Sequence, residues 1–344
     1  MRLRCTRCSG ALESTPTHAL CACCGAAYES CDGVLDLGSS DFYWNQIPRS
    51  AMEALLEEAR VSSWQKALEK HLLPLAGGYV HRYALDERRA DFSCLLPAHR
   101  GAVVLDLGCG WGAVTAGLSR RFENVVSADS TLETLRFVRI RLEQEGLRGV
   151  RLVRIDPLGT GQLPFPDGGF DAVVLNGVLE WVGHSRSEWP VHRLQEATLK
   201  EARRCLCPRG VLYLGIENRF GIELLRGAPD HNGLRFTSLL PRPLASAVSR
   251  LRRAGAYRTY TYSLGGYRRL LRRAGFTREA LFLPKPSYRQ PEYILPGDRL
   301  ALSYYFRHVS ALSGMKRAVA RLLARAGLYP YVADSFAWIA EAPA

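Results

Sequence analysis

The cysteines near the start of the sequence stand in two pairs. Cys5 and Cys8 are separated by two residues, and so are Cys21 and Cys24. Each short loop turns two thiolates toward one point, and four thiolates at tetrahedral corners are a preferred donor set for Zn²⁺. Cys23 would pair with Cys21 at a spacing of one residue, so Cys24 is the expected ligand. The spacing predicts a structural zinc site formed by Cys5, Cys8, Cys21 and Cys24.

A glycine-rich segment, "VLDLGCGWGA", forms a second group with chemical potential. Gly108, Gly110 and Gly112 directly follow an apolar run that contains Asp106. Glycines suit a strand that turns sharply into a helix while its backbone passes close to a ligand. Asp129, at the end of the next apolar run, could accept hydrogen bonds from the ribose of either NAD or S-adenosylmethionine. These residues alone leave both cofactors open, because the segment also fits the dinucleotide fingerprint.

Three further features favour S-adenosylmethionine over a dinucleotide. Asp106 would repel a pyrophosphate, whereas it would favour an ammonium and a sulfonium group. Asp156, at the end of the third apolar run, is placed to accept a hydrogen bond from an adenine amino group. The segment 161–182, "GQLPFPDGGFDAVVLNGVLEWV", contains a turn, a fourth apolar run, and then Asn176 and Glu180.

Taken together, residues 100–218 resemble class I S-adenosylmethionine-dependent methyltransferases, notably the quinone-biosynthesis type. That family carries the motifs "VLDLGCGxG" and "LPFxDxxFDxVxxxxVLEH". In this sequence Trp181 stands where the second motif often has histidine. This departure argues against a catalytic base at that position. The resemblance implies nine cofactor-binding residues. The methionine moiety would lie beside Asp106, Gly108, Cys109 and Gly110, and the ribose beside Asp129 and Ser130. The adenine would contact Asp156 and Leu158, and Asn176 would lie beside the sulfonium.

The first 38 residues resemble the zinc ribbon of the small methyltransferase-activator family. Here the segment after the second cysteine pair reads "YESCDGVLDLG", and Thr6 replaces the proline usual in the first knuckle. A ribbon this short cannot bury a core of its own, so bound metal would supply its folding free energy.

The remaining sequence alternates apolar runs of strand length with amphipathic helical segments. This pattern predicts a parallel sheet covered on both faces, with ligands at the carboxyl ends of its strands. We expect a doubly wound, seven-stranded α/β Rossmann-like methyltransferase sheet with an N-terminal zinc ribbon and helical insertions. The expected divisions are a zinc ribbon (1–38), a helical connector or cap (39–100), and a methyltransferase domain (101–344) with insertions at about 218–261 and 287–334. The aromatic residues at 42–44 are expected to pack as a hydrophobic staple rather than to cap a cleft.

Methyl transfer from a sulfonium already has a good leaving group, so proximity and alignment supply much of the rate. An alcohol or amine acceptor would also need a general base. The candidates are Glu180, His184 and Glu217, with His192 and His231 as further possibilities. A mechanism without a protein base stays open.

Charge points to an anionic partner. The net charge is +13, and the 231–278 segment holds eleven arginines and no acidic residue, which concentrates anions nearby. We expect an acceptor that is a small or lipid-/carrier-linked anionic metabolite of a bacterial glycan or secondary-metabolite pathway. A ribosomal or transfer RNA methyltransferase whose ribbon recognises RNA is the alternative, although "NGVLEW" lacks the motif of enzymes that methylate exocyclic nitrogens. A non-catalytic docking module and an NAD-dependent dehydrogenase are weaker alternatives.

Segment 239–251 could be a lid over the acceptor or a basic amphipathic helix on an anionic membrane, and we favour the lid. No apolar stretch approaches the ~20 residues that a membrane-spanning helix needs. The sequence therefore predicts a cytoplasmic protein, and it leaves the oligomeric state open.

Overall fold

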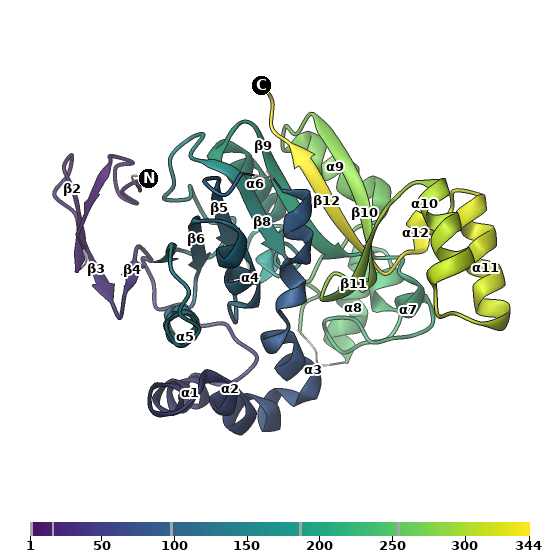
Figure 1. Ribbon diagram of the computed structural model, residues 1–344, viewed down its shortest axis with the longest axis horizontal. Helices are drawn as coiled ribbons and strands as arrows, with labels where there is room; N and C mark the ends of the chain where they lie inside the picture. The colour runs from purple at the N-terminus through teal and green to yellow at the C-terminus, as the bar shows by residue number, and fades with distance from the viewer. Residues whose placement is uncertain (1–2, 16, 97–98, 186–187, 253–254) are drawn as a thin grey trace.

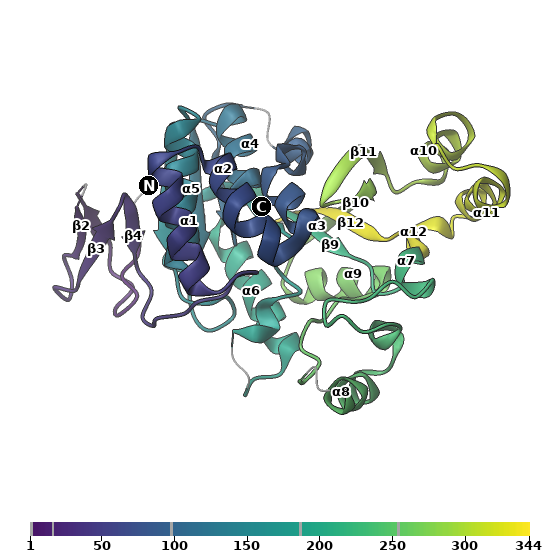
Figure 2. The same ribbon diagram turned by 90° about the horizontal axis from the view of Figure 1, so that it is seen from below.

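One twelve-stranded sheet runs through the molecule, with the strand order β1-β2-β3-β4-β7-β6-β5-β8-β9-β12-β10-β11. The computed structural model describes residues 3–15, 17–96, 99–185, 188–252 and 255–344. The N-terminal strands lie at one end of the long axis, and helices α10 (Arg299–Tyr304) and α11 (Gly314–Arg325) lie at the opposite end (Figures 1 and 2).

The centre of this sheet is the predicted seven-stranded methyltransferase sheet. Its first five strands are parallel, and β12 then pairs with β9 and β10 in antiparallel fashion. Alternate residues of each strand point to opposite faces, and both faces are buried, which explains the nearly continuous apolar runs. The strands are β5 (Val103–Leu107), β6 (Asn124–Asp129), β7 (Val150–Arg154), β8 (Phe170–Asn176), β9 (Leu206–Glu217), β10 (Arg278–Ser287) and β12 (Ser335–Glu341).

Helices cover both faces, as expected for a doubly wound fold. Helices α6 (Val191–Cys205) and α9 (Leu264–Arg273) pack with one face in the main core cluster. Helix α4 (Ala113–Arg121) and the 3₁₀ helix η2 (Glu87–Leu95) pack with the opposite face. Helix α5 (Leu132–Gln144) covers that second face farther toward β7. The core thus holds the carboxyl ends of β5, β6 and β7 at one edge.

The N-terminal strands extend this sheet at its β7 edge. Antiparallel strands β1 (Leu12–Ser14), β2 (His18–Cys21) and β3 (Ala27–Cys31) lead into β4 (Val34–Asp36). Strand β4 pairs in parallel with β7, with Val34 opposite Leu152. The four-cysteine region is therefore continuous with the main sheet through main-chain hydrogen bonds.

Helices follow the ribbon as the sequence predicts. They are α1 (Arg49–Val61), α2 (Trp64–Ala67), the π-helix η1 (Leu68–Leu72) and α3 (Leu73–Leu85). Their buried faces form a cluster with Trp111, in the glycine-rich loop after β5, and with Phe137, on α5. This packing holds the connector against the edge where the cofactor is expected.

Two insertions interrupt the C-terminal part of the domain, one between β9 and α9 and one between β10 and β12. The first contains α7 (Ile222–Leu225), η4 (Thr237–Leu239) and α8 (Arg242–Leu251). The second begins with a strand that the sequence analysis missed, β11 (Gln290–Pro296), which forms a hairpin with β10, and continues through α10, the π-helix η5 (Tyr305–Val309), α11 and α12 (Tyr329–Val332). Among the described residues, no helix combines the length and apolar character required to cross a bilayer.

Candidate functional site

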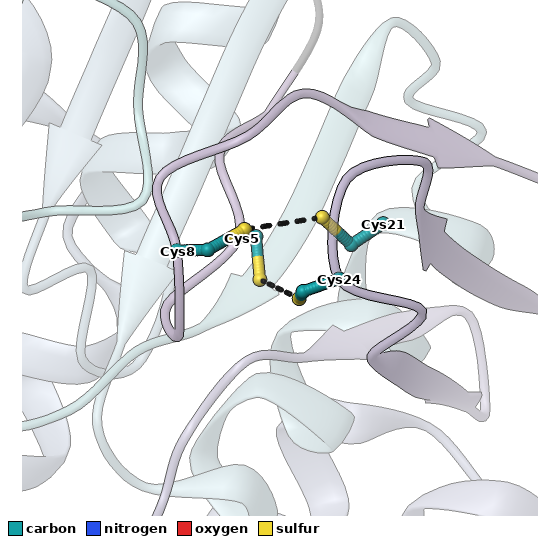
Figure 3. Close-up of side chains that lie close together, drawn as sticks. All are labelled: Cys5, Cys8, Cys21 and Cys24. Atoms are coloured by element: carbon teal, nitrogen blue, oxygen red, sulfur yellow. Dashed lines mark hydrogen bonds between the residues drawn. The ribbon is translucent and has the colours of Figure 1, made fainter.

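The four predicted cysteines come together in the N-terminal region. The Sγ atoms of Cys8 and Cys21 are 3.4 Å apart, and those of Cys5 and Cys24 are 3.6 Å apart (Figure 3). All four Sγ atoms lie within 4.8 Å of one another. Zn–S bonds of about 2.3 Å in a tetrahedron place sulfur atoms about 3.8 Å apart, so the donor set fits Zn²⁺. The cluster is consistent with a zinc site.

The backbone at Gly10 passes close to the cysteine cluster. A Cβ added to Gly10 would lie 2.8 Å from the Cβ of Cys23 and 3.3 Å from the sulfurs of Cys8 and Cys21. The hydroxyl of Tyr28 lies 3.1 Å from the Cys5 sulfur and accepts a hydrogen bond from the Thr6 amide. Tyr28 thus closes the cluster on the side of the first knuckle.

The glycine loop joins β5 to α4 as the sequence predicts. Gly108 and Gly110 have φ angles of 80° and 50°, which disfavour residues with a Cβ. A Cβ at Gly108 would lie 2.7 Å from the Val178 side chain, whereas nothing lies within 4 Å of the position at Gly110. The loop thus packs closely on the segment after β8 and leaves open space above Gly110.

Asp129 organises this loop. Its carboxylate accepts hydrogen bonds from the amides of Gly110, at 3.0 Å, and Thr131, at 3.1 Å. Burial raises the pKa of Asp129, although the amide of Gly110 opposes that shift. The carboxylate is therefore fixed at the carboxyl end of β6, beside the open space at the glycines.

A cavity of about 140 Å³ lies at this edge of the sheet. Six of the predicted cofactor-binding residues line it: Gly108, Gly110, Asp129, Ser130, Asp156 and Leu158. Asp156 also accepts hydrogen bonds from the amide of Ser39, at 2.7 Å, and from its hydroxyl, at 2.9 Å. The segment that follows the ribbon therefore holds the residue expected at the adenine.

The connector contributes aromatic side chains that the sequence analysis assigned to packing. Phe42 and Trp44 line the cavity together with Tyr83. The expectation of a staple was wrong for Phe42 and Trp44, whereas Tyr43 does pack beside the connector core. Because these cavity-lining residues are far apart in the sequence, no motif spacing could have predicted them. The aromatic run at 42–44 was the signal in the sequence that could have done so.

Trp181 also lines the cavity, at the position where the resembling family often has histidine. Its ring lies 5.1 Å from that of Trp44 and 4.8 Å from that of His231. The indole thus takes part in an aromatic wall between this cavity and the first insertion.

Three of the predicted cofactor residues lie behind the cavity wall instead. Asp106 is buried and accepts a hydrogen bond from the Thr115 hydroxyl at 2.6 Å. Burial raises the pKa of Asp106 to about 6. Cys109 is buried in the cluster beneath α5. Asn176 is buried and donates a hydrogen bond to the carbonyl of Arg89 at 3.1 Å.

Glu180 and Glu217, two of the predicted catalytic residues, meet in a buried polar cluster. The hydroxyl of Tyr288 bridges them, at 3.2 Å from Glu180 and 3.0 Å from Glu217. Arg289 forms an ion pair with Glu217, and its guanidinium lies 3.0 Å from the Nε2 of His231. One carboxylate oxygen of each glutamate is buried without a hydrogen-bond partner.

The surroundings of the two carboxyl groups shift their pKa values in opposite directions. Burial and the negative charge of Glu217 raise the pKa of Glu180 well above its ordinary value. Burial acts in the same direction on Glu217, but Arg289 and His231 outweigh it and lower the pKa of Glu217. Burial and the nearby Glu217 thus favour the neutral form of Glu180, whereas Arg289 and His231 favour the charged form of Glu217. The cluster lies just behind the cavity, since a Cβ at Gly177 would lie 2.8 Å from the Tyr288 hydroxyl.

His184, the third predicted catalytic residue, lines the cavity itself. Its Nε2 lies 3.2 Å from the Thr259 hydroxyl. Burial, followed by the charge of Arg258, lowers the pKa of His184. The imidazole is therefore neutral near pH 7 and has one nitrogen able to accept a proton.

A second cavity, of about 620 Å³, adjoins the first and shares Asp156, Leu158 and His184 with it. Its opposite wall comes from the ribbon, through Arg4 and Thr6. The second cavity thus lies between the ribbon and the first cavity.

Comparisons with known proteins agree with this geometry. Residues 105–214 match a family described as a methyltransferase domain. The malonyl-[acyl-carrier protein] O-methyltransferase of Halorhodospira halophila is 31% identical over 125 residues, 36% of this chain and 38% of that protein. A candidate fatty acid methyltransferase of Pseudomonas putida is 36% identical over 91 residues, 26% of this chain and 22% of that protein. This chain therefore spans well under half the length of these relatives.

Among solved structures, the complex between the Trm112 methyltransferase activator of Haloferax volcanii and a candidate methyltransferase shares 15% identity with a TM-score of 0.42. It covers 85% of this chain and 98% of that one. The family match spans the glycine loop, Asp129 and Asp156, and the central sheet is the expected Rossmann-like methyltransferase sheet. The chain therefore contains a class I S-adenosylmethionine-dependent methyltransferase domain.

Proposed function

We propose that the protein transfers a methyl group from S-adenosylmethionine to a small or lipid-/carrier-linked anionic metabolite. One observation carries the proposal: the glycine loop, Asp129 and Asp156 line a single cavity that also receives His184. S-adenosylmethionine would supply the methyl group on its sulfonium. Gly108 and Gly110 would leave room for the methionine moiety, Asp129 would bind the ribose, and Asp156 with Leu158 would contact the adenine.

The acceptor would lie on the His184 side of the cavity. Where the acceptor carries a hydroxyl or amine, His184 is the base that the contacts favour, because it is neutral and reaches the cavity. Glu180 and Glu217 lie behind the cavity wall, and Glu217 is already paired with Arg289, so neither carboxyl is well placed to accept a proton from the acceptor. These glutamates would instead position Tyr288 behind Gly177. A carboxylate acceptor would need no base.

The anionic character of the acceptor is supported by the arginine-rich first insertion and by the relatives. One relative is named for malonyl-acyl-carrier protein and another for fatty acids, which are both acyl compounds with an acidic group. We infer that this chain takes an acceptor of the same general chemistry. In the same proposal, the four cysteines hold a structural Zn²⁺ that fixes the ribbon wall of the second cavity.

The first test is calorimetric titration of the full chain with S-adenosylhomocysteine and, separately, with NAD⁺. Binding of the first alone supports the proposal, and binding of NAD⁺ alone contradicts it. Transfer of a radioactive methyl group would then be measured with malonyl-acyl-carrier protein, fatty acids, phosphorylated glycans and RNA. In that assay His184→Gln should lower kcat at least tenfold on a hydroxyl or amine acceptor and leave S-adenosylhomocysteine affinity unchanged.

RNA methylation remains a second candidate because of one specific observation. The 231–278 segment holds eleven arginines without an acidic residue, a composition suited to a phosphate backbone. However, the described part of this segment uses several of those cations internally. Arg242 lies over the Tyr260 ring at 4.1 Å, and Arg258 donates to the carbonyl of Trp189 at 2.8 Å. Methyl incorporation into RNA, but into no small acceptor, would favour this candidate.

A further inference from the structure

The C-terminal helical unit, residues 299–333, has a surface unlike the rest of the molecule. It comprises α10, η5, α11 and α12 and projects from one end of the sheet (Figures 1 and 2). Nine of the 21 large apolar side chains that are exposed among the described residues belong to these 35 positions. They are Leu300, Tyr304, Val309, Leu312, Met315, Val319, Leu322, Leu328 and Tyr331.

Helix α11 shows the arrangement clearly. Met315, Val319 and Leu322 recur at helical spacing, and their exposed fractions are 80%, 48% and 68%. Ala320 and Ala324, on the other side of the helix, are buried against the main core. The helix therefore packs on the core through Ala320, Ala324 and the partly buried Leu323, and it presents three other large apolar residues outward.

The charges of this unit all have one sign. It holds six cationic residues and no acidic residue: Arg299, Arg307, Lys316, Arg317, Arg321 and Arg325. Within the described part of the chain, none of the six forms an ion pair with a carboxylate. Arg317 and Arg299 instead donate to the carbonyls of Ser310 and Arg325. Lys316 and Arg325 are exposed beside the apolar stripe.

We propose that this unit docks the protein on an anionic phospholipid surface, with the apolar stripe in the headgroup boundary and the cations on lipid phosphates. Exposed apolar side chains beside cations on one helix are what such a surface binds. A two-fold contact with a second copy would place the six cations against the same six cations, which is unfavourable. An RNA partner would match the cations but would leave the apolar stripe against phosphates.

The unit is also tied to the candidate active site. The Asn218 side chain donates to the carbonyls of Tyr331, at 2.9 Å, and Ala333, at 2.8 Å. Asn218 directly follows Glu217, at the carboxyl end of β9. A docked unit would thus hold the carboxyl edge of the sheet at a fixed distance from the lipid surface. Docking goes beyond the proposed methyl transfer and does not require it.

The test is co-sedimentation of the full chain with vesicles of phosphatidylcholine alone or with about 30% phosphatidylglycerol, in about 0.1 M salt. We expect at least tenfold tighter binding to the anionic vesicles and a marked loss at high salt. The double variant Lys316→Gln with Arg325→Gln should weaken that binding at least tenfold. Leu322→Gln should weaken it about tenfold, since an apolar anchor is removed.

Matched controls separate docking from general charge. Lys66→Gln with Arg148→Gln removes the same two charges from the exposed surface elsewhere, and Val61→Gln removes an apolar side chain that is 85% exposed on α1. Both controls should bind vesicles as the parent does. S-adenosylhomocysteine affinity, measured on every variant, verifies folding and reports independently on the methyltransferase proposal.

Three results would overturn the proposal. The first is equal binding to neutral and anionic vesicles, and the second is equal loss in the control variants. The third is absence of vesicle binding together with a concentration-dependent dimer, an RNA complex or an acidic protein complex that Leu322→Gln abolishes.

Discussion

The two ends of the sheet are extended by accessory regions of opposite surface character. The ribbon at the β7 edge is anchored by main-chain pairing and by ion pairs such as Arg154 with Asp36, at 2.8 Å, and Arg4 with Asp167, at 3.1 Å. Leu20 is the one large apolar side chain exposed in the described part of the ribbon. The helical unit at the other end exposes nine such side chains and carries six cations that form no ion pair with a carboxylate among the described residues.

This difference indicates which end of the sheet has its side chains matched by partners in the same chain and which end does not. The four ribbon cysteines form one cluster that is consistent with a zinc site, and Arg4 and Asp36 pair with residues of the main domain, so the ribbon has the character of a structural wall. The C-terminal unit leaves apolar area and charge unmatched, which soluble surfaces seldom do without a partner. The four predictions below test this contrast, from the largest expected effect to the smallest.

The ribbon should depend on its metal far more than any other region depends on a single group. Cys24→Ser should abolish the binding of one Zn²⁺ per chain and unfold the ribbon, because metal binding contributes about 10 kcal/mol or more to such small units. Metal analysis and hydrogen exchange over residues 3–36 measure this. Cys23→Ser, outside the cluster, should keep one Zn²⁺. Full protection of the ribbon without metal would refute its structural role.

The opposite end should respond to pH through a buried lysine. Lys285 donates to the Tyr329 hydroxyl, and burial lowers its pKa to about 8. The unfolded chain therefore binds more protons than the folded chain between about pH 8 and 10.5, so stability should rise across that range by about 3 kcal/mol. Urea unfolding at several pH values measures it.

Lys285→Met should flatten this pH profile and raise stability at pH 7, while the ribbon's zinc content stays unchanged. A profile that is equally steep in the variant would show that another group titrates.

The middle of the sheet should respond independently of both ends. Asp129→Ala should weaken S-adenosylhomocysteine binding about a hundredfold, since the variant loses a ribose acceptor and frees the Gly110 amide. Zinc should remain at one per chain. Calorimetry and metal analysis on the same sample test both statements, and unchanged affinity would remove Asp129 from the ribose site.

The attachment of the ribbon should be weakened by a smaller change. The Arg154 side chain is only 10% exposed and donates to Asp36 and to the carbonyl of Ser40. Arg154→Gln should therefore lower the free energy of unfolding by about 2 kcal/mol, because Asp36 loses its charged partner.

The matched control for that change is Arg60→Gln. Arg60 also joins the ribbon to the domain, through Asp32, but that pair is 43% and 51% exposed. We expect its loss to cost at most about 0.5 kcal/mol. If Arg154→Gln and Arg60→Gln lowered the free energy of unfolding equally in chemical denaturation, burial would not explain the difference expected between the two ion pairs.

Local pattern was sufficient to predict much of the molecule. Strand β6 spans Asn124–Asp129 as its apolar run indicates, and the glycine loop, Asp129 and Asp156 meet at one edge because parallel strands end together. Strand β11 was missed because "QPEYILP" contains two prolines, so its strand character depends on pairing with β10.

The candidate site was predicted where its residues follow strands and was incomplete where they come from elsewhere. Trp44 and Tyr83 line the cavity only because the connector packs across the sheet edge. Arg289 and His231, from different insertions, lower the pKa of Glu217, while burial and the charge of Glu217 raise the pKa of Glu180. No spacing rule relates such residues.

The sequence by itself determined the cysteine pairs, the glycine loop and the strand periodicity, because each depends on neighbours within a few positions. Only the tertiary structure decided that Asp106 and Asn176 lie behind the cavity wall and that β4 joins the main sheet. It also decided which face of α11 is left exposed. Burial and long-range pairing depend on how separate elements pack, and that information is distributed over the whole chain.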